Sequence, residues 1–90
     1  MNKSDLVSAI ADNSGLSKAD AARALDATTS AITGALAKGD SVAITGFGSF
    51  LVRARAARSG RNPQTGAALQ IPARTVPSFK AGAALKAAVN

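Results

Sequence analysis

Apolar residues recur at intervals of three or four through the first part of the chain, the spacing of one face of an α-helix. A first helix is expected between Asn2, a good N-terminal cap, and Gly15, a natural stop. A second should begin at Ser17, in a capping-box-like start, and run to about Lys38, before Gly39. The first stripe consists of Leu6, Ala9, Ile10 and Asn13, and the second of Ala22, Leu25, Thr29, Ile32 and Leu36. The pattern predicts a helical hairpin.

After Gly39 the period changes to two, which is typical of β-strands. Residues 41–45 predict a short strand, Gly46–Gly48 a tight reversal, and residues 49–58 a longer strand. In the longer strand, one face carries Phe50, Val52 and Ala54, and the other carries Leu51, Arg53 and Arg55.

The seven residues Gly60–Gly66 are dense in turn formers and should reverse a long β-ribbon. The chain then returns through residues 67–71 and resumes the sheet at residues 76–79. Pro72 and Pro77 cannot donate to a ladder, so they are expected at edge positions. Residues 83–89 predict a short closing helix.

These elements predict an α+β fold: a helical hairpin, a three-stranded antiparallel sheet with a long β-ribbon arm at about residues 53–74, and a short C-terminal helix. We expect one domain over residues 1–90, with a helical dimerisation half (1–40) and a second half (41–90) that holds the sheet, arm and closing helix. A major-groove helix-turn-helix is the alternative for the first half. It is disfavoured because the second helix is long and offers Arg23 and Lys38 as cations beside two aspartates.

The apolar content is generous at 47%, but 22 of the 90 residues are alanines, which bury little each. A small domain with so few large apolar residues is marginal alone, so we expect a dimer, either of identical chains or with a close paralogue. The candidate core and dimer residues are Phe47, Phe50, Phe79, Leu25, Ile32, Leu36 and Ile44.

Charge is distributed unevenly along the chain. Residues 1–40 hold four cations and five aspartates, a net charge of −1, whereas residues 41–90 hold seven cations and no acid. Such asymmetry favours a polyanionic partner, above all a nucleic acid. The alternative without a binding partner is a solvated basic face that only aids solubility.

Several segments resemble the bacterial histone-like DNA-binding family, HU: GFGSF, RAARSGRNPQTG, IPA and FKAGAALKAAVN, with MNKSDL and GDSV. The resemblance spans essentially the whole chain, and its tip motif, GRNPQTG, is highly specific. It implies an intertwined dimer whose two arms embrace double-stranded DNA from the minor-groove side, with Pro63 as the wedge between base pairs. The sequence departs from the family pattern at Ala67, Ala68, Gln70 and Ala83, where relatives often carry Lys or other charged residues. These departures bear on binding strength rather than mode, and Arg74 is a candidate to offset part of the loss.

The candidate DNA-binding residues are Arg53, Arg55, Arg58, Arg61, Asn62, Pro63, Gln64, Arg74, Lys3, Lys80 and Lys86. Arginine suits phosphate because it stays charged and binds two oxygens at once. Asn62 and Gln64 can read the minor groove only coarsely, because its donor and acceptor pattern is degenerate. We therefore expect weak sequence preference and a bias toward bent, nicked or flexible DNA.

Other classes of function are disfavoured. The chain has no His, Cys, Tyr, Trp or Glu, and its aspartates all lie in the first half, so no catalytic residues, metal site, cofactor or small-molecule substrate is expected. Its cations follow a ribbon rather than the polar face of an amphipathic helix, which argues against a membrane partner. An RNA-binding module and a sequence-specific DNA-bending protein of the integration host factor type remain as alternatives. The expected location is the cytoplasm, in association with the nucleoid.

Overall fold

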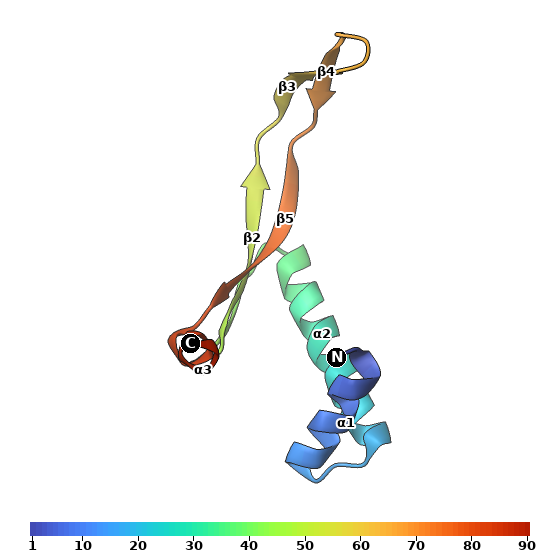
Figure 1. The fold of residues 1–90 in the computed structure, drawn as a ribbon, viewed down its shortest axis with the longest axis vertical. Helices are drawn as coiled ribbons and strands as arrows, with labels where there is room; N and C mark the ends of the chain where they lie inside the picture. The colour runs from blue at the N-terminus through green and yellow to red at the C-terminus, as the bar shows by residue number, and fades with distance from the viewer. The chain divides into compact units, whose positions relative to one another are not determined.

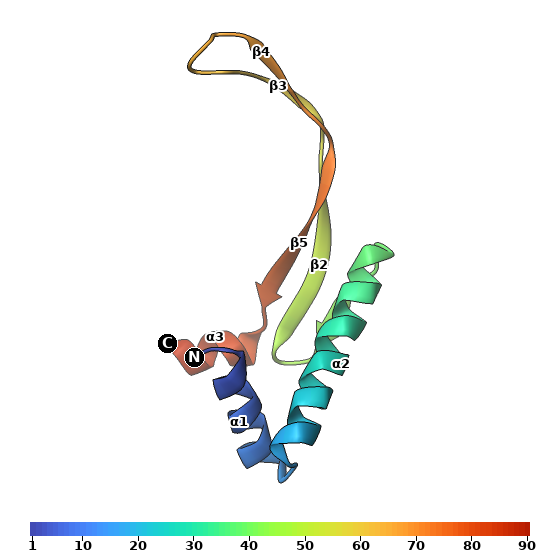
Figure 2. The ribbon, with the colours of Figure 1, turned by 90° about the vertical axis from the view of Figure 1, so that its right-hand side faces the viewer.

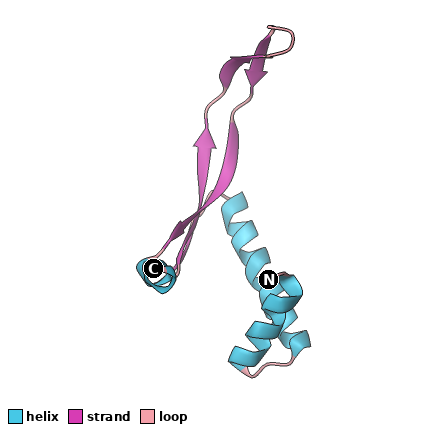
Figure 3. Ribbon diagram, in the orientation of Figure 1, coloured by secondary structure: helices cyan, strands magenta, loops and turns pink.

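The computed structural model describes the backbone of residues 1–90 and all side chains except those of Arg58, Leu69 and Ile71. The chain divides into two units, Met1–Gly34 and Ala35–Asn90. Figure 3 shows that helices dominate the first unit, whereas the second is mainly strands that end in a short helix. The expected α+β class with a three-stranded antiparallel sheet is confirmed.

Helix α1 (Lys3–Ser14) begins and ends at the residues that the sequence indicates. The Asn2 side chain accepts a hydrogen bond from the Asp5 N–H at 2.9 Å, and the Asp5 carboxylate accepts one from the Asn2 N–H at 3.2 Å. This reciprocal capping box satisfies two backbone donors at the start of the helix. At the other end, Gly15 adopts a left-handed conformation (φ 76°), and its N–H donates to the Ala11 carbonyl at 3.0 Å.

Helix α2 (Lys18–Ala37) starts after Ser17, whose hydroxyl accepts from the Asp20 N–H at 3.1 Å. In the ribbon, α1 and α2 are joined by a short turn (Figure 2). Thr29, the polar member of the predicted stripe, is exposed and donates its hydroxyl to the Asp26 carbonyl at 3.1 Å. Among the described side chains, only the small residues Ala11 and Ala21 are buried apolar residues. The larger members of the stripe stay half-buried, namely Leu25, Ile32 and Leu36.

The sheet has the strand order β1-β2-β5 and is antiparallel throughout. Its strands are β1 (Val42–Ile44), β2 (Gly48–Arg55) and β5 (Arg74–Ala81). Pro77 lies in β5, an edge strand, as expected for a residue that has no N–H to donate to a neighbouring strand.

The arm departs from the prediction of one continuous strand over residues 49–58. Strand β2 stops at Arg55, and a separate two-stranded ladder of β3 (Arg58–Arg61) and β4 (Ala68–Ile71) follows. Figures 1 and 2 show this ladder as the continuation of the β2–β5 ribbon. The pairing register is unbroken, because Arg55 faces Arg74 and Arg58 faces Ile71, so no residue is inserted in either strand.

A change of register therefore does not explain the gap between the β2–β5 and β3–β4 ladders. The cause lies in the residues at the gap. The unbroken register places Ala57 opposite Pro72, just where the ladder is lost. The proline ring fixes φ near −65° and removes the N–H, and both effects weaken strand pairing.

Helix α3 (Ala83–Val89) follows the sheet directly after Gly82. Gly82 and Gly48 both lie where an added side chain would not fit. The Gly82 N–H donates to the Phe47 carbonyl at 2.7 Å, and a Cβ at Gly82 would meet backbone atoms of Gly46 and Phe47 at 2.9 Å. Buried Gly48 is tighter still, since a Cβ there would lie 2.5 Å from the Phe79 ring and 2.6 Å from the Lys80 carbonyl oxygen.

We expect Gly48→Ala to destabilise the fold by about 1–3 kcal/mol, the usual cost of overpacking, because the Lys80 backbone cannot move aside. For a domain of this size, each kcal/mol should lower Tm by roughly 4–8 °C. Gly34→Ala is the matched control: no atom lies within 4 Å of the added methyl, and alanine favours the helix by about 0.5–1 kcal/mol. Thermal unfolding of both variants gives the comparison, and equal Tm values would show that the close packing at Gly48 is of no consequence.

Candidate nucleic-acid interface

The β2–β5 register sorts the ribbon into a cationic face and an apolar face. Residues directly opposite each other in an antiparallel pair point to the same side, and neighbours along a strand alternate. Arg53 faces Val76, Arg55 faces Arg74 and Ser49 faces Lys80. The cationic face therefore carries Arg53, Arg55, Arg74 and Lys80, all of them exposed. The apolar face carries Phe50, Val52, Phe79 and Pro77.

Two arginines, Arg55 and Arg74, lie directly across from each other where β2 ends and β5 begins. Cβ atoms of such a pair are about 4.5–5.5 Å apart, and like charges at this spacing repel each other. Residues 41–90 contain no acid that could compensate. The pair therefore weakens the isolated ribbon and suits a partner that supplies several negative charges.

The tip of the arm, residues 62–67, is held together by its own hydrogen bonds. The Asn62 N–H donates to the Ala67 carbonyl at 2.8 Å, and the Gly66 N–H donates to the Asn62 carbonyl at 2.7 Å. Gly66 adopts φ 70°, a conformation that favours glycine. Pro63 and Gln64 are exposed on this loop, whereas Asn62 is half-buried.

The Asn62 side chain is already engaged within the protein. Its Oδ1 accepts the Gln64 N–H at 2.9 Å, so this oxygen is occupied by the loop. Thr65, which the sequence reasoning did not single out, acts in the same way and accepts the Ala67 N–H at 3.2 Å. Its place inside a turn, just before Gly66, was the signal that could have identified it, because Ser and Thr hydroxyls often bond the backbone two residues ahead.

The remaining predicted cations are spread over several elements. Arg61 is exposed at the end of β3, opposite Ala68 and next to the tip. Arg58 begins β3, but its side chain lies outside the described set. Lys86 is exposed in the last turn of α3. The structure thus brings four cations together on the ribbon face and places Arg61 beyond them toward the tip.

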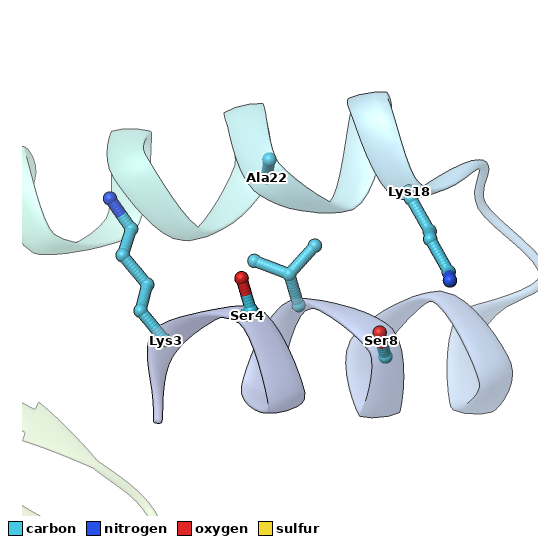
Figure 4. Close-up of a pocket in the computed structure, with 6 residues that line it drawn as sticks. Lys3, Ser4, Ser8, Lys18 and Ala22 are labelled. Atoms are coloured by element: carbon cyan, nitrogen blue, oxygen red, sulfur yellow. The ribbon is translucent and has the colours of Figure 1, made fainter. Parts of the chain in front are cut away.

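Lys3 belongs to the helical unit, where its ammonium lies 2.8 Å from the Asp26 carboxylate. Both side chains are largely exposed, so the ion pair contributes at most about 1 kcal/mol and a phosphate could displace the carboxylate. A groove of about 500 Å³ runs between α1 and α2 beside it. Figure 4 shows Lys3 and Lys18 at its two ends, with the hydroxyls of Ser4 and Ser8 between them on α1. Lys18 thus adds a cation on this side that the sequence analysis had not selected.

The three phenylalanines form one cluster at the base of the ribbon. The Phe79 ring centroid lies 4.8 Å from that of Phe50 and 5.6 Å from that of Phe47, within the range of favourable aromatic pairs. However, Phe47 remains 46% exposed and Phe79 41% exposed. Phe47, a candidate core and dimer residue, is therefore not part of a buried core within a single chain. Ile44, another predicted core residue, is also 41% exposed.

The described side chains offer no cluster of three or more metal-ligating residues. In the same part of the chain, no helix combines the length and apolar character that crossing a bilayer requires.

Comparison with known proteins agrees with this surface. All of residues 1–90 match the family model described as "Bacterial DNA-binding protein". The chain belongs to this family. It is 61% identical to DNA-binding protein HU of Geobacillus stearothermophilus and 59% identical to DNA-binding protein HU-beta of Pseudomonas aeruginosa, with full coverage of both chains in each case. Among solved structures, the Anabaena HU–DNA cocrystal structure matches with a TM-score of 0.91 and 44% identity, over 99% of this chain and 97% of that one.

Membership of the bacterial DNA-binding protein family confirms the resemblance drawn from the GFGSF and GRNPQTG motifs. It also confirms the prediction that the chain is not an enzyme. The roles of individual residues on the ribbon, tip and helices stay predictions.

Proposed function

We propose that this chain is an architectural DNA-binding protein that binds duplex DNA without sequence specificity and bends it. The observation that carries this proposal is the exposed cationic face of the ribbon, where Arg55 and Arg74 oppose each other with no acid in the whole second half of the chain. Its similarity to HU proteins, one of them crystallised with DNA, supports the same function.

The proposed mechanism separates affinity from bending. Guanidinium and ammonium groups along Arg53, Arg55, Arg74 and Lys80 would replace condensed counterions at phosphates, which gives affinity without base reading. Pro63, exposed at the tip, would enter a base step as an apolar wedge, as architectural minor-groove proteins do. Proline is suited to this role because it has no N–H that would lose its partner between bases.

We propose that the chain acts as an intertwined dimer, with itself or with a close paralogue. The support is the apolar surface of a single copy, in which Phe47, Phe79 and Ile44 are each more than 40% exposed. Within one functional domain, residues 1–40 would form the helical dimerisation half, and the apolar base of the sheet would add Ile44, Phe47 and Phe79 to the dimer contacts. The remaining surface of residues 41–90 would bind DNA. In this arrangement the two arms would embrace one duplex, and the protein would work in the cytoplasm on the nucleoid.

The test of the function is a binding series with four probes of equal length: two unrelated intact duplexes, one nicked duplex and one RNA duplex. Architectural binding predicts similar affinity for the two intact duplexes and tighter binding to nicked DNA, which is already easy to bend. Preference for one intact sequence by several kcal/mol would instead identify a site-specific protein of the integration host factor type. Equal or tighter binding to the RNA duplex would identify an RNA-binding module.

Pro63→Ala is expected to reduce DNA bending while leaving the salt dependence of binding nearly unchanged, because it removes the wedge and no charge. Unstacking a base step costs a few kcal/mol, which the wedge must offset. Arg61→Ala is the matched variant two residues away, and it should make the salt dependence shallower with less effect on bending. Fluorescence energy transfer between the ends of a short duplex, at saturating protein and several salt concentrations, measures both. Equal bending by Pro63→Ala and the parent protein would reduce Pro63 to a turn residue.

A further inference from the structure

The tip loop is held on both sides of Pro63 by side chains that accept hydrogen bonds from the loop backbone. Asn62 precedes Pro63, and its Oδ1 reaches over the proline to accept the Gln64 N–H at 2.9 Å. Thr65 follows, and its Oγ1 accepts the Ala67 N–H at 3.2 Å. Both are short-range turns in which a side chain replaces a backbone acceptor.

Backbone hydrogen bonds add to these side-chain bonds in restricting the loop around Pro63. The backbone bonds from Asn62 to Ala67 and from Gly66 to Asn62 close the loop, and the proline ring fixes its own φ. The rotations left to orient the Pro63 ring are its own ψ and the backbone angles of its neighbours, and the two side-chain bonds restrict these rotations. An exposed loop of this size would otherwise sample several conformations, and only the fraction that presents the ring outward could enter a base step.

The alternative role for Asn62 is base reading in the minor groove. The structure gives Asn62 a role within the loop, because the side chain is half-buried and its Oδ1 accepts the Gln64 N–H. Its Nδ2 is the group that would donate to minor-groove acceptors, and the double variant described below separates the two roles. Thr65 carries no charge, so it does not supply the cationic contact that dominates phosphate binding. The contact that the structure shows for its Oγ1 is the bond from the Ala67 N–H. Both side chains therefore have an observed role in the loop.

We infer that Asn62 and Thr65 are positioning residues that hold Pro63 in the orientation in which it enters a base step. This inference rests on the proposed bending function. It assigns DNA contact to Pro63 and assigns to its two neighbours the task of keeping the binding-competent loop populated. The loss of either bond lowers that population, and the apparent affinity for bent DNA falls by the same factor.

The experiment compares Thr65→Val, which keeps the side-chain shape but loses the acceptor, with Thr65→Ser, which keeps the acceptor. Asn62→Ala and Asn62→Ser form a second pair, since a serine hydroxyl makes the same turn more weakly. Thr65→Val and Asn62→Ala should each reduce bending of an intact duplex at saturation. They should also weaken binding about two- to tenfold, the effect of one neutral hydrogen bond. The serine variants should recover most of both losses, and the salt slope should not change in any variant.

Two further readouts separate positioning from direct contact. In the free protein, hydrogen exchange at the Ala67 N–H should accelerate in Thr65→Val, and exchange at the Gln64 N–H should accelerate in Asn62→Ala. In a Pro63→Ala background, Asn62→Ala should cause no additional loss of bending, because it acts only through the proline.

The outcomes distinguish this inference from the proposed function. If Pro63→Ala bends DNA less but Asn62→Ala and Thr65→Val bend it like the parent, the positioning role is wrong. The proposed insertion of Pro63 into a base step is then still supported. Additive loss in the Pro63→Ala background would make Asn62 a direct DNA contact and overturn the inference. Failure of Thr65→Ser to recover bending would do the same for Thr65. If Pro63→Ala bends DNA like the parent, the insertion of Pro63 into a base step is refuted. The positioning role of Asn62 and Thr65 is then refuted as well, because it depends on that insertion.

Discussion

DNA affinity should fall about a thousandfold when monovalent salt rises from roughly 50 to 200 mM, as expected for a protein that contacts about six phosphates. Each chain offers seven cations in residues 41–90, so a dimer offers fourteen, of which we expect fewer than half to meet phosphates. The corresponding slope of log K against log salt is about −5. Fluorescence anisotropy of a labelled duplex over a salt series measures this slope.

Arg55→Ala is the variant that tests the cationic face. It removes one phosphate contact per chain, so the slope should become shallower by about one for each copy. Arg23→Ala is the matched control, because Arg23 is an exposed arginine on α2 that forms an ion pair with Asp20. It should leave the slope unchanged. A parent slope near zero, or equal slopes for the two variants, would contradict phosphate binding by the ribbon.

The same substitution should affect stability in the opposite direction. Arg55→Ala removes the repulsion between Arg55 and Arg74, so unfolding should become slightly harder, by about 0.2–1 kcal/mol. A gain in stability that accompanies a loss of binding is typical of residues kept for function rather than for the fold.

Local rules predicted the helices and the faces of the ribbon well. Asn2 and Gly15 bound α1 because capping depends on a few adjacent residues. The alternation of Phe50 and Val52 with Leu51 and Arg53 identified the two faces, because the period of two is a property of the strand itself. The prediction of one strand over residues 49–58 failed because its interruption depends on Pro72, which is remote in sequence and opposite in the ladder.

In the candidate site, too, local sequence predicted some features, whereas others depend on the folded structure. The cations and Pro63 could be found by residue type, and the register then showed which of them share a face. The use of Asn62 as a turn acceptor could not be separated from base reading in the sequence, because asparagine is suited to both. The pairing of Lys3 with Asp26 depends on how α1 packs against α2, which the spacing of residues within each helix does not determine.

The exposure of the phenylalanine cluster leads to the second large effect, on the free energy of unfolding. Phe79 contacts both other rings, at centroid distances of 4.8 and 5.6 Å, yet 41% of it is exposed in a single chain. Truncation of a fully buried phenylalanine costs about 3–5 kcal/mol, and a partly exposed ring costs less. The size of the effect therefore reports whether a second copy covers the cluster.

Phe79→Ala should destabilise the protein by the full value of about 3–5 kcal/mol, because the proposed dimer buries the ring. The parent midpoint of unfolding should rise with protein concentration, as mass action requires of a folded dimer, and that of the variant should be shifted far below it. Val89→Ala, at a side chain that is 76% exposed in α3, is the control and should change the midpoint little. Chemical denaturation of the parent protein and both variants at two protein concentrations measures these midpoints. A parent midpoint independent of concentration, together with a folded monomer in sedimentation at micromolar concentration, would refute the dimer and leave the exposed rings without a partner.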